Sequence, residues 1–237
     1  MRRRPGVLSR DDLLLDWRRL VLRCFVINFE GIDRSGKGTH TARLAKNLAG
    51  RGLKVATRHF PVLETPVGRL IGDFLAGRVP LAPACVQMLY AANRWEEREH
   101  LLAILREVDV LILDRWCPSG WAYGMAVGLP RPWLQNLDAG LPVPDLTILM
   151  EVPPEVAAGR RRTTGKDVLE SDLAFQGRVA AAYRELAAAG GWAVVRVEEE
   201  KDAVEAKVLA VAERAMREAG ALPPSWPRGA RGPEGSG

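Results

Sequence analysis

Short apolar segments alternate along the chain with longer segments in which apolar residues recur at helical spacing. The apolar segments are rich in β-branched residues and end at glycine, proline or charged residues, as buried strands do. They cover residues 24–30, 53–60, 108–114, 145–152 and 191–197. Helical spacing marks about 37–51, 67–76, 83–106, 154–163, 172–189 and 202–219. Apolar strands that alternate with helices predict an α/β fold in which helices cover both faces of a five-stranded parallel sheet.

Both ends of the chain depart from this pattern. Near the start, Ser9 and Asp12 resemble a helix capping box. The apolar residues that follow at helical spacing are Leu13, Leu14, Trp17, Leu20 and Val21. We therefore expect residues 1–23 to form a helical extension and residues 24–220 to form one domain. Residues 221–237 are rich in proline and glycine, which predicts a disordered tail.

Composition narrows the class of protein. The 237 residues are 47% hydrophobic, and the formal net charge is +5, which suits nucleic acids and small polyphosphates equally. No basic run carries interleaved aromatic residues, so we expect no nucleic-acid partner. No apolar run is long enough to span a membrane. The 3 cysteines are too few and too scattered for a disulfide framework or a zinc site. We therefore expect a cytoplasmic protein.

The stretch FEGIDRSGKGTH has the spacing of a phosphate-binding loop. Gly31, Gly36 and Lys37 match the pattern G-x-x-x-x-G-K between a predicted strand and a predicted helix. Backbone N–H groups of such a loop surround an anion, and the lysine adds a positive charge for the outer phosphates. The hydroxyl residue that usually follows the lysine is absent, because Gly38 stands there and Thr39 comes next.

The stretch DRW ends the third predicted strand. The carboxyl ends of parallel strands lie at one edge of a sheet, so Asp114 and Arg115 are expected near the glycine loop. Asp114 can hold Mg²⁺ through water, and Arg115 can bind a phosphate through two parallel hydrogen bonds. An Asp-Arg pair at this position could also be a structural ion pair.

Three stretches together are similar to the thymidylate kinases: FEGIDRSGKGTH, DRWCPSGWAYG and YAANRWEE. The resemblance covers about residues 25–197. It implies a three-layer P-loop fold with a small lid at about residues 160–171 and a homodimer. It also implies ATP-dependent phosphorylation of dTMP to dTDP with Mg²⁺ as cofactor. The glycine after Lys37 resembles adenylate and uridylate kinases of the same group more than the thymidylate kinases.

The resemblance assigns roles to individual residues. Catalysis falls to Lys37, Arg34, Asp114 and Arg115, with Arg34 placed against the transferring phosphoryl group. Mg²⁺ falls to Asp114 and Thr39. The residues implied for ATP are Gly31, Ile32, Asp33, Arg34, Ser35, Gly36, Lys37, Gly38, Thr39, Arg160 and Arg162. Those implied for dTMP are Asp33, Phe60, Tyr90, Arg94, Arg115, Ser119, Gly120, Tyr123 and Gln176.

Two departures from the family pattern leave alternatives open. Leu63 stands near the position where the family usually has an arginine for the acceptor phosphate, and Gly38 replaces the magnesium hydroxyl. Arg58 or Arg69 could compensate, or Arg115 could act alone. The alternatives are a kinase of the same fold for another nucleoside monophosphate, a catalytically impaired homologue that acts through partners, and a nucleic-acid-binding ATPase.

Overall fold

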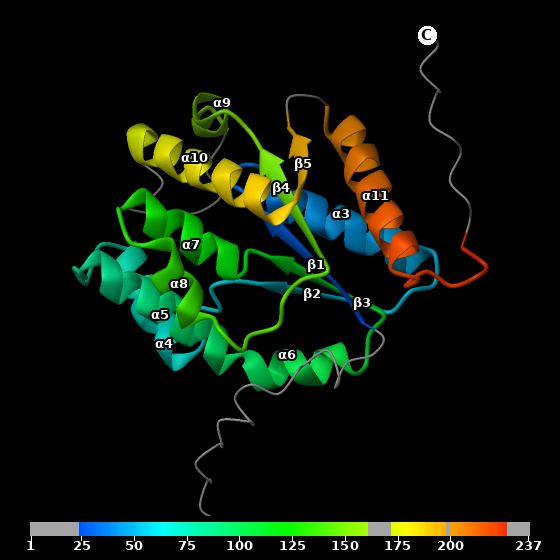
Figure 1. Cartoon of the computed structure of the whole chain (residues 1–237), viewed down its shortest axis with the longest axis horizontal. Helices are drawn as coiled ribbons and strands as arrows, with labels where there is room; N and C mark the ends of the chain where they lie inside the picture. The colour runs from blue at the N-terminus through cyan, green and yellow to red at the C-terminus, as the bar shows by residue number, and fades with distance from the viewer. Residues whose placement is uncertain (1–23, 161–171, 198–199, 227–237) are drawn as a thin grey trace, which may run out of the picture.

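The computed structural model describes residues 24–160, 172–197 and 200–226. Within these ranges the chain forms one α/β unit (Figure 1). The expected helical extension at residues 1–23, the lid residues 161–171 and Arg162 among them lie outside the described residues. No helix in the described ranges is long and apolar enough to cross a membrane.

The predicted five-stranded parallel sheet is confirmed. Its strands stand in the order β2-β3-β1-β4-β5. They are β1 (Phe25–Glu30), β2 (Val55–His59), β3 (Val110–Asp114), β4 (Leu146–Glu151) and β5 (Ala193–Arg196). β1 pairs with β3 and β4, and its last residues lie beside Asp114 and Leu149. The ends of these central strands therefore bring the glycine loop and the DRW segment to one edge.

Helices cover both faces of the sheet. The side chains of β1 point alternately to the two faces, and each set packs against different helices. Phe25, Ile27 and Phe29 pack with α3, whereas Val26 packs with α6. α3 also contacts α11, and α10 contacts α7 on the face of Glu30. The helices are α3 (Lys37–Gly50), α4 (Pro66–Leu75), α5 (Pro83–Glu96), α6 (Arg98–Leu105), α7 (Cys117–Ala126), α8 (Arg131–Leu137), α9 (Pro154–Ala158), α10 (Leu173–Gly190) and α11 (Lys201–Glu218).

Three details of the helices differ from the sequence-based expectation. The helix predicted over residues 83–106 is divided at Glu97 into α5 and α6. Neither α7 nor α8 was predicted, because Pro118, Gly120 and Gly124 hide the helical pattern of α7. A Cβ at Gly124 would lie 2.5 Å from Leu134 Cδ2, so this glycine permits the close packing of α7 against α8.

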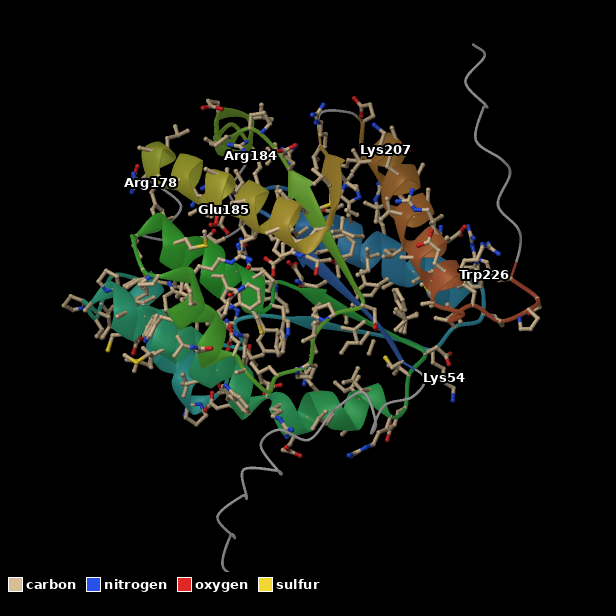
Figure 2. The ribbon with its side chains drawn as sticks, in the orientation of Figure 1. Lys54, Arg178, Arg184, Glu185, Lys207 and Trp226 are labelled. Carbon is tan, nitrogen blue, oxygen red and sulfur yellow. The ribbon has the colours of Figure 1, made fainter. Side chains whose placement is uncertain are left out.

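Residues 221–226 also correct an expectation, since they were assigned to a disordered tail. Trp226 is 5% exposed and belongs to the main hydrophobic cluster. The Arg51 guanidinium, at the end of α3, lies 5.4 Å from the centre of the Trp226 ring. Figure 2 shows Trp226 near the C-terminal end of α11. The packed domain therefore extends to this tryptophan, because burial of a large aromatic side chain fixes the backbone that carries it.

Candidate active site

The glycine loop joins β1 to α3 and has the backbone geometry of an anion-binding turn. Gly31 and Gly36 have φ values of 144° and 92°, in the region that favours glycine. A Cβ at Gly31 would lie 2.6 Å from the backbone oxygen of Met150, so a side chain cannot be accommodated there. Gly36 is the residue at the start of α3, and the helix N-terminus faces the loop.

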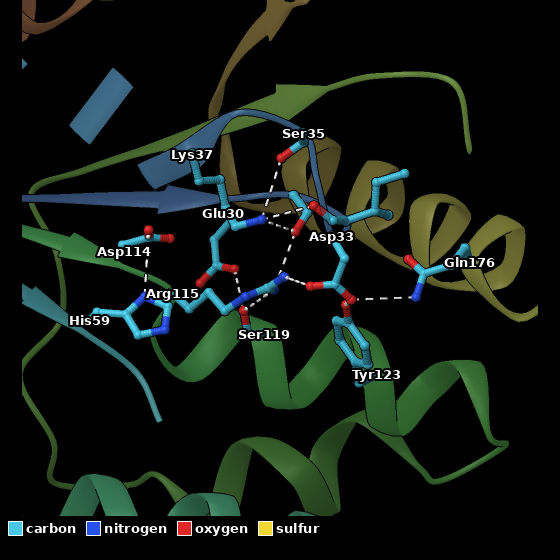
Figure 3. A network of polar contacts seen from close by, with 12 residues as sticks. Glu30, Asp33, Ser35, Lys37, His59, Asp114, Arg115, Ser119, Tyr123 and Gln176 are labelled. Atoms are coloured by element: carbon cyan, nitrogen blue, oxygen red, sulfur yellow. Dashed lines mark hydrogen bonds and ion pairs between the residues drawn. The ribbon is translucent and has the colours of Figure 1, made fainter. Parts of the chain in front are cut away.

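The Lys37 ammonium group is turned into the loop. Nζ donates to the backbone oxygens of Gly31 at 3.0 Å and Ile32 at 2.8 Å (Figure 3). Ile32 and Ser35 are themselves buried. Burial, with the nearby positive charge of Arg115, lowers the pKa of Lys37 to about 8. Oxygens of a bound phosphate would compete with these two carbonyl oxygens for the Lys37 ammonium group.

Arg115 links the DRW segment to the glycine loop. It has a φ of 68°, which is uncommon for a residue with a side chain and marks local strain. Its guanidinium donates to Asp33 Oδ1, to the Gly31 oxygen at 3.2 Å and to Ser119 Oγ at 3.2 Å. Burial raises the pKa of Asp33, but the charges of Arg115 and Lys37 outweigh it and hold that pKa below its usual value.

Glu30 anchors this cluster and was missed by the sequence analysis. Its carboxylate is fully buried and accepts hydrogen bonds from Ser119 Oγ at 2.6 Å, Tyr183 OH at 2.9 Å and the Trp116 backbone N–H at 2.9 Å. Tyr183 also contacts Arg115 at 3.3 Å. The available signal was an acidic residue at the end of an otherwise apolar strand, which must have partners when buried.

Asp114 lies beside the glycine loop, as expected. A Cβ at Gly38 would lie 3.3 Å from Asp114 Oδ2, so the residue after the lysine directly adjoins the carboxylate. Oδ1 is buried and has no hydrogen-bond partner among the described residues. Burial raises the pKa of Asp114, but a hydrogen bond from His59 and the charge of Lys37 outweigh burial and hold that pKa below its usual value. Thr39 is exposed at the start of α3.

An available carboxylate oxygen next to the loop fits a hard cation such as Mg²⁺. The described residues contain no group of three or more His, Cys, Asp or Glu side chains able to hold a metal. Mg²⁺ at this place would therefore depend on Asp114, phosphate oxygens and water, a common arrangement for this ion.

The residues expected for the acceptor fall into two sets. Tyr123 OH donates to Asp33 Oδ2 at 2.6 Å, and Gln176 Nε2 lies 3.4 Å from the same oxygen. These two side chains thus join the loop cluster (Figure 3). Tyr90 is half-buried on α5. Phe60 is 3% exposed and packs its ring against Trp116, which places it in the core.

Arg94 lies deep between α5 and α7, and its carboxylate partner was not predicted. The guanidinium donates from Nε to Asp138 Oδ1 at 2.9 Å and from Nη2 to Asp138 Oδ2 at 3.1 Å. Trp121 Nε1 donates to the same carboxylate at 2.8 Å. Both charged side chains are at most 5% exposed. A paired, hydrogen-bonded arrangement is what buried charges require.

The lid side of the loop carries two further arginines. Arg34 has a φ of 61° and donates to the Ala158 oxygen at 3.3 Å. Arg160 donates to the Arg34 backbone oxygen at 2.8 Å and to the Val197 oxygen at 3.3 Å. The loop, the end of α9 and the end of β5 are therefore joined at one place.

The two arginines considered as substitutes near Leu63 have other partners. Arg58 contacts His100 Nε2 at 2.6 Å on α6, and Arg69 donates to the Glu64 oxygen at 2.8 Å. Leu63 itself is 41% exposed. This geometry leaves Arg115 as the arginine that faces both the loop and α7.

Comparisons with known proteins agree on one family. A sequence model described as thymidylate kinase matches residues 29–208. The chain belongs to the thymidylate kinase family. A thymidylate kinase from Caenorhabditis elegans is 34% identical over 206 residues, which cover 83% of this chain and 93% of the relative. One from Arabidopsis thaliana is 34% identical over 186 residues, which cover 78% of this chain and 70% of the relative.

A solved structure supports the same assignment. The thymidylate kinase from Candida albicans superposes with a TM-score of 0.69 at 28% identity, covering 81% of this chain and 92% of its own. The predicted P-loop fold and the predicted family are therefore both confirmed. The matches run through the glycine loop, α5 and the DRW segment, which carried the resemblance in the sequence.

Proposed function

We propose that this thymidylate kinase transfers the γ-phosphoryl group of ATP to dTMP, giving dTDP and ADP, through the residues of this cluster. The observation that carries the assignment of residues is the Asp33–Arg115 pair, which couples the glycine loop to the DRW segment. One rim of the sheet thus holds positive charge for two anionic substrates. Such an enzyme works mainly by aligning the substrates and neutralising charge.

The donor side is formed by the loop and the two arginines at the base of the lid. Lys37 exchanges its contacts with the loop carbonyls for oxygens of the outer phosphates. Arg34 stabilises the negative charge that develops on the transferring group. Arg160, already bonded to the loop backbone, and Arg162 close over the triphosphate. Closure excludes water, which favours transfer to dTMP over hydrolysis.

The acceptor side is formed by α5 and α7. Arg115 binds the phosphate of dTMP, since its guanidinium lies between the loop and Ser119. The Tyr123 ring, held by its bond to Asp33, lies beneath the deoxyribose and leaves little room for a 2′-hydroxyl. The Tyr90 ring stacks on the thymine base, and Arg94 bonds the edge of that base.

We also propose that Asp114 holds Mg²⁺, with Thr39 as a further oxygen contact. The ion would neutralise phosphate charge in the transition state. Removal of the carboxylate in Asp114→Asn should raise the Mg²⁺ concentration needed for half-maximal activity by about tenfold or more. A magnesium titration measures this, and an unchanged midpoint would contradict the assignment.

A homodimer and a cytoplasmic location are also proposed. The dimer is what the family resemblance implies. The location is consistent with three free cysteines, which suit a reducing compartment. Size-exclusion chromatography with light scattering tests the first proposal, and fractionation of cells tests the second.

A panel of nucleoside monophosphates tests the function. With ATP and Mg²⁺, formation of ADP should be fastest with dTMP when the panel contains dUMP, dCMP, dAMP and dGMP. Exposed Leu63 makes acceptor selectivity the part most in need of measurement. If only a monophosphate with another base is turned over, that nucleotide is the acceptor in place of dTMP. If no monophosphate gives ADP, the chain is a catalytically impaired homologue.

A further inference from the structure

One face of α5 carries a polar atom that the residues assigned so far do not use. Gln87, Tyr90 and Arg94 are spaced by three and four residues, so their side chains lie along one face of the helix. Gln87 is 5% exposed, and its Oε1 has no hydrogen-bond partner among the described residues. A buried amide oxygen without a partner is unfavourable, so its position requires a reason, such as a ligand.

The backbone of Gly120 on α7 shows where this oxygen lies. A Cβ at Gly120 would be 3.0 Å from Arg94 Nη2, 3.4 Å from Arg94 Nη1 and 3.5 Å from Gln87 Oε1. A strong donor and an available acceptor thus converge on one place beside α7. The absence of a side chain at Gly120 lets both polar groups approach the α7 backbone closely.

The donor has a fixed orientation. Asp138 binds Nε and Nη2 of Arg94, and Trp121 holds Asp138 in turn. Arg94 Nη1 makes no hydrogen bond with a side chain or backbone group in residues 24–160, 172–197 and 200–226. The rigid guanidinium therefore presents this nitrogen at Gly120, the same part of α7 that the Gln87 oxygen adjoins.

A donor beside an acceptor is complementary to a ring edge on which a carbonyl adjoins an N–H group. Thymine and uracil present O4 beside N3–H. Cytosine presents an amino group beside an unprotonated N3, which is the reverse order. We propose that Gln87 determines the base: its Oε1 accepts the N3–H of thymine while Arg94 donates to O4. This inference rests on the proposed function and adds a specificity-determining residue to it.

The pair makes a defined prediction about selectivity. dUMP presents the same edge as dTMP, so this pair accepts both. dCMP and dAMP present a donor to Arg94 and an acceptor to Gln87, so both contacts become unfavourable. Guanine presents O6 beside N1–H, so the pair does not exclude dGMP, and rejection of that base must come from its size.

The first experiment replaces the acceptor by a side chain of similar length without one. In Gln87→Met, kcat/KM for dTMP and dUMP should fall about 10- to 100-fold, mainly through KM, while dCMP is unchanged or improved. The dTMP-to-dCMP ratio should therefore fall at least about tenfold. A ratio equal to that of the wild type would overturn the proposal. Gln135→Met on α8, outside the site, is the matched control and should leave the ratio unchanged.

A second experiment separates recognition from a merely structural role. In the 3-methyl derivative of dTMP, a methyl group replaces the N3 proton and meets Gln87. The wild type should reject this acceptor, and Gln87→Ala should use it better than the wild type does, although dTMP itself becomes worse. If Gln87 had only a structural role, Gln87→Ala should lower the activity with both acceptors alike, and that result would refute the proposal. A wild type inactive with dTMP would instead reject the proposed function.

Discussion

Two buried arginine–aspartate pairs divide the site, and they differ in charge balance. Arg115 pairs with Asp33, whose side chain is 25% exposed and whose pKa is held below its usual value. Arg94 pairs with Asp138, whose side chain is 3% exposed. Burial is the largest influence on Asp138 and raises its pKa despite the neighbouring guanidinium. The first pair is partly exposed, whereas the second is almost fully buried.

The difference matches what each region has to bind. Around Asp33 the cations Arg115 and Lys37 lie together with the carboxylates of Glu30 and Asp114, so several charges of both signs meet at the loop. Around Arg94 the one carboxylate of Asp138 balances the guanidinium, and the neighbouring Gln87 is neutral. A region with two cationic donors beside the loop suits phosphates, and a rigid region whose charges are paired suits an uncharged base. The comparison predicts different consequences when each region is disturbed.

Loss of charge in the cluster around Arg115 and Asp33 should have the largest effect on activity. Lys37→Ala removes the donor to the outer phosphates, and kcat should fall by about 10³–10⁵-fold with the fold retained. Steady-state kinetics measures kcat, and circular dichroism shows whether the fold is retained. Lys46→Ala, on the exposed face of the same helix, is the control and should retain activity. Near-normal turnover in Lys37→Ala would contradict the role given to the loop.

Loss of charge in the buried Arg94–Asp138 pair should instead reduce stability. Asp138→Ala leaves the Arg94 guanidinium buried without a counter-charge, which costs about 3–5 kcal/mol in the free energy of unfolding. Asp33→Ala should cost less, because its carboxylate is partly exposed and Arg115 retains Ser119 and Tyr183. Urea titrations monitored by tryptophan fluorescence compare the variants. Equal losses in both would remove the distinction between the two regions.

The two regions also differ in how far the sequence could predict them. The donor loop is a local pattern: its glycines and lysine lie between Gly31 and Lys37, directly flanked by a strand and a helix, and the structure places them as expected. Arg94 was predicted from α5, but its partner Asp138 lies 44 residues away. Glu30 and Tyr183 are 153 residues apart. Spacing along the chain carries little information about such pairs.

Helix α7 shows why part of the fold was also missed. It supplies Ser119 to the charged cluster and Gly120 to the neutral region. Its glycines disfavour a helix by propensity, but they allow it to approach α5 and α8. Tertiary packing therefore determines the structure of this segment, and the pattern of residues in a single sequence carries no information about such packing. The sheet was predictable because its central strands, such as β3, are apolar along almost their whole length.

Proton uptake on ATP binding offers a smaller and more specific test of the charged region. Burial, then Arg115, lowers the pKa of Lys37 from 10.5 to about 8. Bound phosphates favour the protonated form, so ATP binding should take up a proton above pH 8 but not well below it. Affinity for ATP should fall by up to about tenfold per pH unit above 8. Calorimetry at pH 7 and pH 9, in buffers with different heats of ionisation, measures the uptake.

The Lys37→Ala variant provides the control for this titration, because it has no ammonium group to protonate. Its ATP binding should be weaker at both pH values and should lack the uptake at pH 9. Uptake that persists in the variant would assign the proton to another group.

Gly124 gives the smallest expected effect, and it connects the two regions. Gly124→Ala places a Cβ 2.5 Å from Leu134 Cδ2 and 2.8 Å from Cδ1, so α7 or the leucine must move. Overpacking of this kind costs about 1–3 kcal/mol in the free energy of unfolding. Gly177→Ala is the matched control on α10, where a Cβ meets nothing within 4 Å, and should stabilise by about 0.5–1 kcal/mol.

The kinetic consequence of Gly124→Ala distinguishes movement of α7 from repacking of Leu134 alone. A shift of α7 displaces Ser119, Gly120 and Tyr123 together, so the Michaelis constant for dTMP should rise a few-fold. The constant for ATP should stay near that of the wild type, because the glycine loop is held by β1 and α3. If stability falls while both constants are unchanged, Leu134 has absorbed the strain and α7 tolerates packing changes. Equal increases in both constants would mean that the two regions move as one body, against the division drawn from their charges.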